Sequence, residues 1–279
     1  MGQILIGAVG SLVATVVVLL TRLAFYKVYD MFPARALFKG IVGSEKSCLV
    51  FVLRMTDLER KGEFLGLLPT YAVATQQPRF ERRQLIPYVN STSETTSVAY
   101  VLNVLGSAGR AENIQLAYVD KDFDKWDAPM FILGGSVKAT RAFETCNPYF
   151  TFRVDRFVLT STGESYVPKT ADHDMGLLQK MINPSTNLPV WVAMGWRGAG
   201  TIAATYALTR WWKELGFLYG SKPFGMLLEM NDADGWQQFR IVRFQPEAAR
   251  LRKIVHPLAW YRLRRTLPQA SLREGQGLH

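Results

Sequence analysis

Residues 4–21 form an uncharged, apolar run near the start of this chain of 279 residues. As a helix the run reaches about 27 Å, and residues 23–26 extend it toward the roughly 30 Å thickness of a bilayer core. A helix that is buried in a soluble protein is rarely apolar on every face over so many turns. The sequence therefore favours a single transmembrane helix over residues 4–24 rather than a buried soluble helix.

Basic residues follow this apolar run and none precedes it: they are Arg22, Lys27, Arg35, Lys39 and Lys46. Because cytoplasmic flanks are rich in Lys and Arg, this bias predicts a single-pass protein of the cell membrane with its C-terminal part in the cytoplasm. The beginning of the sequence lacks the features of a cleaved secretory signal, so the helix is expected to be retained. Small residues along one helix face predict a homo-oligomer formed through it, and they are Gly7, Gly10, Ser11 and Ala14.

The net charge of +10 is concentrated outside the central part of the chain. Residues 1–47 carry +3 and residues 250–279 carry +6, which leaves +1 for residues 48–249. Basic residues beside a cytoplasmic leaflet gain about 1 kcal/mol each from anionic lipid, so membrane lipid is the expected partner of both flanks. A solvated, disordered tail is the alternative for the C-terminal flank. No nucleic-acid-binding module is recognisable, and no specific nucleic-acid partner is predicted.

Composition divides the chain into an anchor with its basic flank (1–29), a linker (30–47), an α/β domain (48–249) and a basic tail (250–279). Within the domain, predicted strands alternate with predicted helices. The strands are expected at 47–55, 114–119, 130–133, 190–194, 224–229 and 239–244, and the helices at 93–106, 137–146 and 202–215. This alternation is typical of a mostly parallel, Rossmann-like three-layer α/β sheet. Residues 149–167, which contain a turn at 161–163, predict an antiparallel insertion or edge.

Two glycine-rich turns follow predicted strands and precede predicted helices. In open α/β sheets, ligands bind beyond the carboxyl ends of the strands, where a helix N-terminus offers free N–H groups to an anion. The two turns are therefore expected to lie side by side at one edge and to bind a nucleotide-like or phosphorylated small molecule. The candidate ligand-binding residues are Asp57, Gly134, Gly135, Ser136, Gly195, Trp196, Gly198, Gly200 and Thr201. The alternative is that the glycines only permit tight turns.

Each of the non-glycine candidates has an expected role. Asp57 follows the first strand and is predicted to face the same cleft as the glycine turns. Ser136 and Thr201 can cap their helices and donate a hydroxyl to phosphate. The Trp196 indole can stack on a base, an interaction worth about 1–3 kcal/mol in other proteins. Together these residues predict a site for both the phosphate and the base of a nucleotide.

The turns at 134–136 and 198–201 resemble those of the Rossmann-like nucleotide-binding superfamily that includes the LOG and SLOG proteins. Members pair glycine-rich turns around nucleotide or nucleoside ligands, and some are sensor domains of bacterial defence proteins joined to membrane segments. The resemblance covers residues 48–245 by pattern and implies nucleotide binding. The LOG signature P-G-G-x-G-T-x-x-E is absent, and Gly200-Thr201 matches only its G-T part. The missing signature argues against LOG-type hydrolase activity and leaves nucleotide binding open.

Asp172-His173-Asp174 is the one place where a histidine lies between carboxylates. His173 could act as a base near neutral pH, and Asp172 could hold a ribose hydroxyl or serve as the second catalytic group. The alternative is a hydrated loop capped by one of the aspartates. No metal site is predicted: residues 120–131 begin like an EF-hand loop but lack its glycine and its final glutamate. The sequence identifies no cofactor.

Three functions follow from these observations. The first is a membrane-tethered cytoplasmic sensor or binding domain for a nucleotide-like or phosphorylated ligand. The second is an enzyme, a hydrolase or transferase, acting on nucleotides or nucleotide sugars through Asp172 and His173. The third is a structural, membrane-anchored interaction protein in which the glycines only turn the chain. The pair of glycine turns favours the first.

Overall fold

Seven strands form the central sheet: β1 (Cys48–Val52), β2 (Ile114–Tyr118), β3 (Met130–Leu133), β7 (His173–Ile182), β8 (Pro189–Gly195), β9 (Phe224–Asn231) and β10 (Phe239–Gln245). Their order across the sheet is β10-β9-β7-β8-β3-β1-β2. The computed structural model describes residues 13–24, 31–42, 44–52, 92–109, 113–118, 126–135, 137–153 and 156–246. The sheet separates two hydrophobic cores, one on each of its faces.

The sheet is mixed, with a parallel half and an antiparallel half. β2, β1, β3 and β8 are parallel to one another, whereas β7, β9 and β10 pair in antiparallel fashion. The prediction of a mostly parallel sheet is therefore wrong. Residues 183–188 join β7 to β8, and residues 232–238 join β9 to β10. Connections this short produce antiparallel neighbours, because a parallel pair needs a crossover of about a dozen residues or more.

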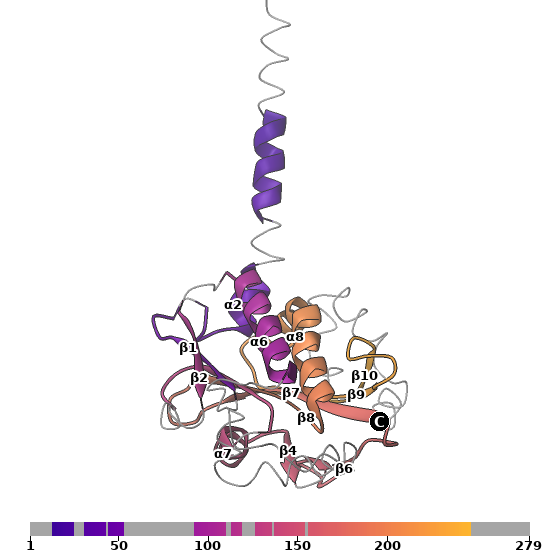
Figure 1. Cartoon of the computed structure of the whole chain (residues 1–279). Helices are drawn as coiled ribbons and strands as arrows, with labels where there is room; N and C mark the ends of the chain where they lie inside the picture. Colours follow the sequence, from indigo (N-terminus) through magenta and orange to yellow (C-terminus); the bar gives the residue numbers. More distant parts are fainter. Residues whose placement is uncertain are drawn as a thin grey trace, which may run out of the picture.

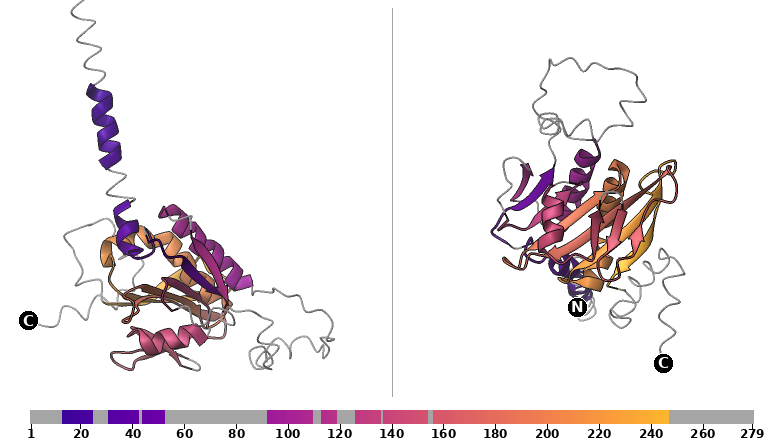
Figure 2. Two further views of the ribbon diagram at one scale, coloured as in Figure 1. Left: turned by 90° about the vertical axis from the view of Figure 1, so that its left-hand side faces the viewer. Right: turned by 90° about the horizontal axis from the view of Figure 1, so that it is seen from below.

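Helices cover both faces of this sheet (Figure 1 and Figure 2). α2 (Phe32–Leu37), α6 (Thr92–Ser107) and α8 (Gly198–Tyr219) lie on one face, and α7 (Val137–Thr145) lies on the other. α6 buries Val101, Val104 and Leu105, a spacing that places apolar side chains along one side of a helix. α8 is buried along most of its length because it packs against the sheet, α2 and α6.

A second, antiparallel sheet lies on the α7 face and consists of β4 (Phe150–Arg153), β5 (Arg156–Leu159) and β6 (Ser165–Tyr166). The antiparallel strands that the sequence predicts over residues 149–167 form this separate sheet. Its inner face is apolar, and Phe150 and Phe157 are fully buried. The Gln179 side-chain amide of β7 accepts a hydrogen bond from the Phe150 N–H at 2.8 Å and donates one to the Phe150 carbonyl at 3.2 Å. The main sheet therefore holds the small sheet by polar and apolar contacts.

The predicted transmembrane helix requires a correction. The described part of the N-terminal run is helical over residues 13–24, which are exposed and stand apart from the body in Figure 1. Among the described residues, no helix combines the length and apolar character needed to cross a membrane. The fold class is therefore mixed α/β without an observed transmembrane helix, and residues 4–12 lie outside the described part.

Residues 31–42, which the sequence assigns to a linker, pack into the body. Leu37 is fully buried, and a Cβ on Gly216 would collide with the Pro33 carbonyl, so α2 and α8 are in close backbone contact. The Lys180 ammonium of β7 donates hydrogen bonds to the Leu37 carbonyl at 2.5 Å and to the Gly220 carbonyl at 3.2 Å. Lys180 therefore joins the carboxyl ends of α2 and α8. The predicted basic tail, residues 250–279, lies outside the described residues.

Candidate anion-binding site at the carboxyl edge of the sheet

The two glycine turns lie side by side, as the sequence predicts. β3 and β8 pair in parallel with Leu133 opposite Ala193. Directly after β3, the Gly134 N–H donates a hydrogen bond to the Ala193 carbonyl at 2.9 Å. Both turns therefore begin at one edge of the sheet. Asp57 and Ser136, two of the predicted ligand-binding residues, lie outside the described residues.

The strand order reverses at β1, which lies between β2 and β3. α6, the next described helix after β1, packs on the α8 side of the sheet, whereas α7 leaves β3 for the opposite side (Figure 1). In open α/β sheets, ligands bind at the carboxyl ends of the strands at such a topological switch point. We therefore expect a ligand site at the switch point between β1 and β3.

The first turn of α6 reaches the glycine turns. A Cβ on Gly134 would lie 2.9 Å from Oε1 of Glu94, and a Cβ on Gly198 would lie 2.9 Å from the Ser93 side chain. Gly134 also has a φ of +76°, which favours glycine. Glu94 is only 8 % exposed, so a carboxylate group is held against the turn that follows β3. The sequence predicts only a helix start at Ser93 and Glu94, and the contact with Gly134 depends on tertiary packing.

A buried cation lies at the start of α7. Lys138 is fully buried in the first turn of this helix, and its ammonium nitrogen lies 4.8 Å from the ring centroid of Phe51 in β1. The same nitrogen lies 5.1 Å from the Trp126 ring, which Arg141 contacts one turn later. A lysine in the first turn adds its positive charge to the partial positive charge of the helix N-terminus, and together the two attract anions. In the sequence, the feature that could have identified Lys138 as a site residue is its position four residues after Gly134.

The start of α8 has a different chemistry, because an internal carboxylate binds its N–H groups. The fully buried Asp174 accepts hydrogen bonds from the N–H groups of Gly200 at 2.6 Å, Arg197 at 3.0 Å and Met175 at 2.7 Å. Burial raises the pKa of the Asp174 carboxyl, while the three N–H groups and the Arg197 charge act in the opposite direction. Asp174 thus takes the place at this helix end that a phosphate would occupy.

The glycines of the second turn allow close packing. A Cβ on Gly200 would collide with the Met175 carbonyl, and a Cβ on Gly195 would collide with the Arg197 carbonyl and the Thr201 nitrogen. α8 can therefore begin directly against β7 and β8. Thr201 is buried, and the Trp196 ring packs edge-on against Phe152, with 6.0 Å between the ring centroids. The geometry gives this turn a packing role, and ligand binding by its residues stays a prediction.

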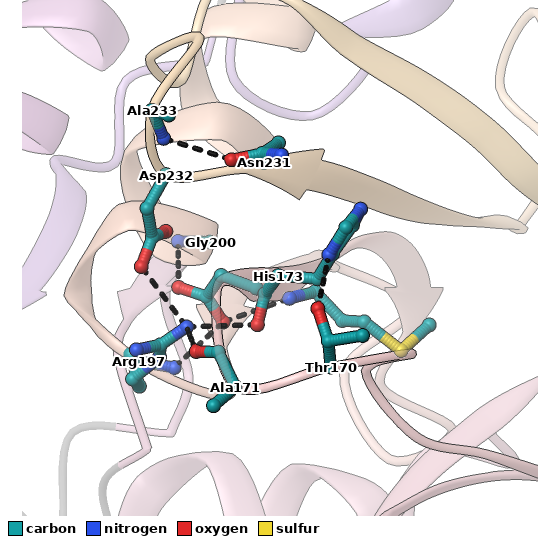
Figure 3. A network of polar contacts seen from close by, with 10 residues as sticks. Thr170, Ala171, His173, Arg197, Gly200, Asn231, Asp232 and Ala233 are labelled. Carbon is teal, nitrogen blue, oxygen red and sulfur yellow. Dashed lines mark hydrogen bonds and ion pairs between the residues drawn. The ribbon is translucent and has the colours of Figure 1, made fainter.

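Asp172 and His173 lie at the same edge, because β7 begins beside the end of β8. Nδ1 of His173 lies 2.7 Å from the Thr170 hydroxyl, and the Asp172 side chain is exposed. Figure 3 shows the Arg197 guanidinium, which donates hydrogen bonds to the carbonyls of Ala171 and His173 and pairs with Asp232 at 3.0 Å. These contacts fix the turn before β7. Catalytic roles for Asp172 and His173 stay predictions.

Comparison with known proteins adds no family. No family model matches the chain, and no curated protein matches it. Within the described part of the chain, no group of three or more His, Cys, Asp or Glu residues is placed to hold a metal ion. The resemblance to the LOG and SLOG proteins therefore stays a hypothesis that rests on the glycine turns.

Proposed function

We propose that this protein is a binding module for a nucleotide-like or phosphorylated small molecule, which it holds at the switch point between β1 and β3. The observation that carries the proposal is the buried Lys138 ammonium at the start of α7, beside the end of β1. The sensor role, the cytoplasmic location, the lipid contact and the homo-oligomer stay predictions from the sequence. They are separate from this binding site.

The groups at the switch point suit an anion on one side and a hydroxyl-bearing group on the other. The first N–H groups of α7 and the Lys138 ammonium provide positive charge, and Gly135 leaves room for close approach. The Glu94 carboxylate repels a phosphate and accepts hydrogen bonds from hydroxyl or amino groups. We therefore expect the phosphate to bind toward α7 and the sugar or base to lie toward Glu94.

This placement differs from binding at the start of α8. Asp174 already accepts the N–H bonds of Gly200 and Arg197, so a phosphate there would have to displace a buried carboxylate. The enzyme alternative rests on Asp172 and His173. The carbonyl groups of Ala171 and His173 accept hydrogen bonds from the Arg197 side chain and so fix the turn. We therefore propose binding and no reaction.

The experiment tests ligand binding and the role of Lys138 together. The full chain is screened by thermal shift against nucleoside mono-, di- and triphosphates, nucleotide sugars and the corresponding nucleosides, and positive compounds are measured by calorimetry. Lys138→Met keeps a side chain of similar length in the apolar site and removes the charge. Lys222→Met is the matched control, because Lys222 is exposed in the turn after α8.

We expect phosphorylated compounds to bind and their nucleosides to bind more weakly. Loss of one charge-assisted contact should lower the affinity of Lys138→Met about tenfold or more, whereas Lys222→Met should stay within twofold. The melting temperatures without ligand serve as the folding control. If no phosphorylated compound binds at millimolar concentration, or if a folded Lys138→Met binds as tightly as the unmodified protein, the proposal is wrong.

A further inference from the structure

The helix over residues 13–24 exposes its large apolar side chains on every side. Their exposed fractions lie between 47 % and 64 %, and the residues are Val13, Val16, Val17, Val18, Leu19, Leu20 and Leu23. Exposed apolar surface of this kind marks a site of contact with a partner. In both Figure 1 and Figure 2 this helix stands on the α2 side of the body. The chemistry of that side therefore indicates what the partner is.

α2 is the first described element after this helix, and its outward side is aromatic and basic. The helix buries Pro33, Ala34 and Leu37 against the body. Phe32 is 53 % exposed, and Arg35 is exposed as well. Because residues three apart on a helix are neighbours, these two side chains share the outward side of α2. A large apolar ring and a cation therefore lie next to each other at the surface.

α8 contributes a second aromatic ring to this surface. The ring centroids of Phe32 and Phe217 lie 6.1 Å apart, so the start of α2 touches the last turns of α8. Phe217 is half-buried, and about one turn earlier Lys213 and Glu214 contribute opposite charges. The positive charge of the surface therefore comes from other residues.

Two further cations lie where α2 and α8 end. Both ends meet at Lys180, which donates hydrogen bonds to the Leu37 and Gly220 carbonyls. Lys39 is exposed two residues after α2, and it lies close enough to Lys180 for its charge to lower the Lys180 pKa. Lys222 is exposed two residues after Gly220. The cations that follow the two helices therefore lie around one point of the body.

We infer that the α2 face, defined by Phe32, Arg35, Lys39, Phe217 and Lys222, lies against a membrane surface that contains anionic lipid. Basic residues are attracted to such headgroups, and exposed aromatic rings enter the boundary between headgroups and acyl chains. Among the described residues, Arg35, Lys39 and Lys222 form no ion pair, so their charges are available for lipid phosphate. The inference requires contact with the membrane surface and no helix that crosses the bilayer. It goes beyond the binding function proposed above and uses no residue of the switch point.

The combination of apolar and basic surface favours lipid over other partners. Nucleic acid would attract the cations through its phosphates, but its backbone offers no apolar partner for the helix over residues 13–24. A second copy of the chain would place the same cations opposite one another, because a two-fold interface uses one patch twice. Anionic lipid supplies negative headgroups and an apolar interior side by side. The α2 face and the helix before it present the matching groups in the same order.

The test determines which side of the protein faces a vesicle. A fluorescent label is attached to Ser221→Cys, beside Lys222, and in a second protein to Ser161→Cys in the small sheet on the opposite side of the body. Both serines are exposed turn residues, and the two native cysteines are buried, so the label reacts with the new cysteine. Residue 221 is far from the apolar helix in the sequence, so attachment of that helix to lipid does not by itself place the label at the surface.

The labelled full chains are mixed with phosphatidylcholine vesicles that contain or lack phosphatidylserine. A nitroxide group on some of the headgroups quenches labels that lie near the membrane surface. We expect the label at Ser221→Cys to be quenched at least twofold more than the label at Ser161→Cys. We also expect this quenching to be stronger with phosphatidylserine than without it, because the headgroup charge attracts the cations.

A matched pair of charge variants tests the role of the cations. Arg35→Gln removes a charge from the α2 face, and Arg153→Gln removes an exposed arginine from the small sheet. Arg35→Gln should lower the partitioning of the full chain onto phosphatidylserine vesicles about fivefold. Arg153→Gln should stay within twofold. The melting temperature and circular dichroism of each variant show that it is folded.

Four outcomes would overturn the inference. A full chain that does not bind phosphatidylserine vesicles has no such surface. Equal quenching of the labels at 221 and 161 would show that no particular face contacts lipid. Equal losses in Arg35→Gln and Arg153→Gln would show attraction by net charge alone. Self-quenching of the label at 221 that grows with protein concentration without lipid would show that a second copy covers this face.

Discussion

The starts of α7 and α8 lie at the same edge of the sheet, and both follow a glycine turn, yet their chemistry differs. The N–H groups at the start of α8 are bound by the buried carboxylate of Asp174. The start of α7 holds a buried lysine, with the ring of Phe51 beside its ammonium group. A helix N-terminus that follows a glycine turn is therefore not sufficient to predict an anion site. At the start of α8 an internal carboxylate, that of Asp174, already accepts these N–H groups.

The largest expected effect concerns a glycine whose surroundings leave no space for a side chain. Gly200→Val would place side-chain atoms against the Met175 carbonyl, whereas a Cβ on Gly135 would meet only Met194 Cε at 3.7 Å. We expect Gly200→Val to lower the free energy of unfolding by about 3 kcal/mol or more, or to prevent folding. Urea denaturation measures the loss. If the urea midpoint of Gly200→Val equals that of the unmodified protein, α8 can move away from β7 without loss of stability, which would contradict the prediction.

The second prediction compares two aspartates that are two residues apart. Asp174→Ala leaves three N–H groups without their acceptor and should cost about 2–4 kcal/mol of stability. Asp172→Ala removes an exposed side chain and should change the free energy of unfolding by less than about 0.5 kcal/mol. The two variants are compared by urea denaturation at pH 7. Equal losses would contradict the view that Asp174 alone satisfies the start of α8.

The third prediction concerns the other end of α8, where Lys180 binds the Gly220 carbonyl and the Leu37 carbonyl of α2. Burial, and to a lesser degree the charge of Lys39, lowers the pKa of Lys180 from 10.5 to about 7. Above pH 7 the unfolded chain then holds a proton here that the folded chain has released. The free energy of unfolding should therefore rise with pH, by at most about 1.4 kcal/mol per pH unit. Below about pH 6 this rise should be absent.

Lys180→Met isolates this contribution, because methionine does not titrate. The difference in stability between the unmodified protein and the variant should grow by about 1.6 kcal/mol between pH 7 and pH 8.5. Taking the difference also cancels the contributions of other titrating groups. One of them is the Cys146 thiol, because burial raises its pKa to about 11. Urea denaturation at four pH values provides the data. A difference that is constant with pH would mean that the Lys180 pKa is not lowered in the folded state.

The same comparison explains which parts of the fold and site follow from the sequence. β3 and β8 are uninterrupted apolar runs that end at glycines, so both the strands and the meeting of their turns could be predicted. β7 was missed because Asp174, Gln179 and Lys180 are polar residues that the fold buries. Because β7 pairs with both β8 and β9, missing it left the strands predicted at 224–229 and 239–244 without their link to the parallel strands.

The site residues show a similar limit. Glu94 and Lys138 are ordinary helix-forming residues in the sequence, and they gain their significance from contacts with Gly134 and Phe51 that only the fold creates. Gly195 and Gly200 stand out in the sequence, yet their surroundings are backbone atoms of β7 and α8. A prediction from local pattern therefore gives both turns the same ligand-binding role. The described contacts show close packing at Gly195 and Gly200 of the second turn.

The most direct test of the central claim is a binding comparison of two Gly→Ala variants. Gly135→Ala adds a methyl group at the turn before α7 without a close contact, and Gly106→Ala adds one in α6 where nothing lies within 4 Å. Calorimetry with a phosphorylated compound found in the screen measures both variants against the unmodified protein. We predict at least a tenfold loss of affinity for Gly135→Ala and none for Gly106→Ala, with both melting temperatures retained. Unchanged affinity in a folded Gly135→Ala would contradict ligand binding at the switch point.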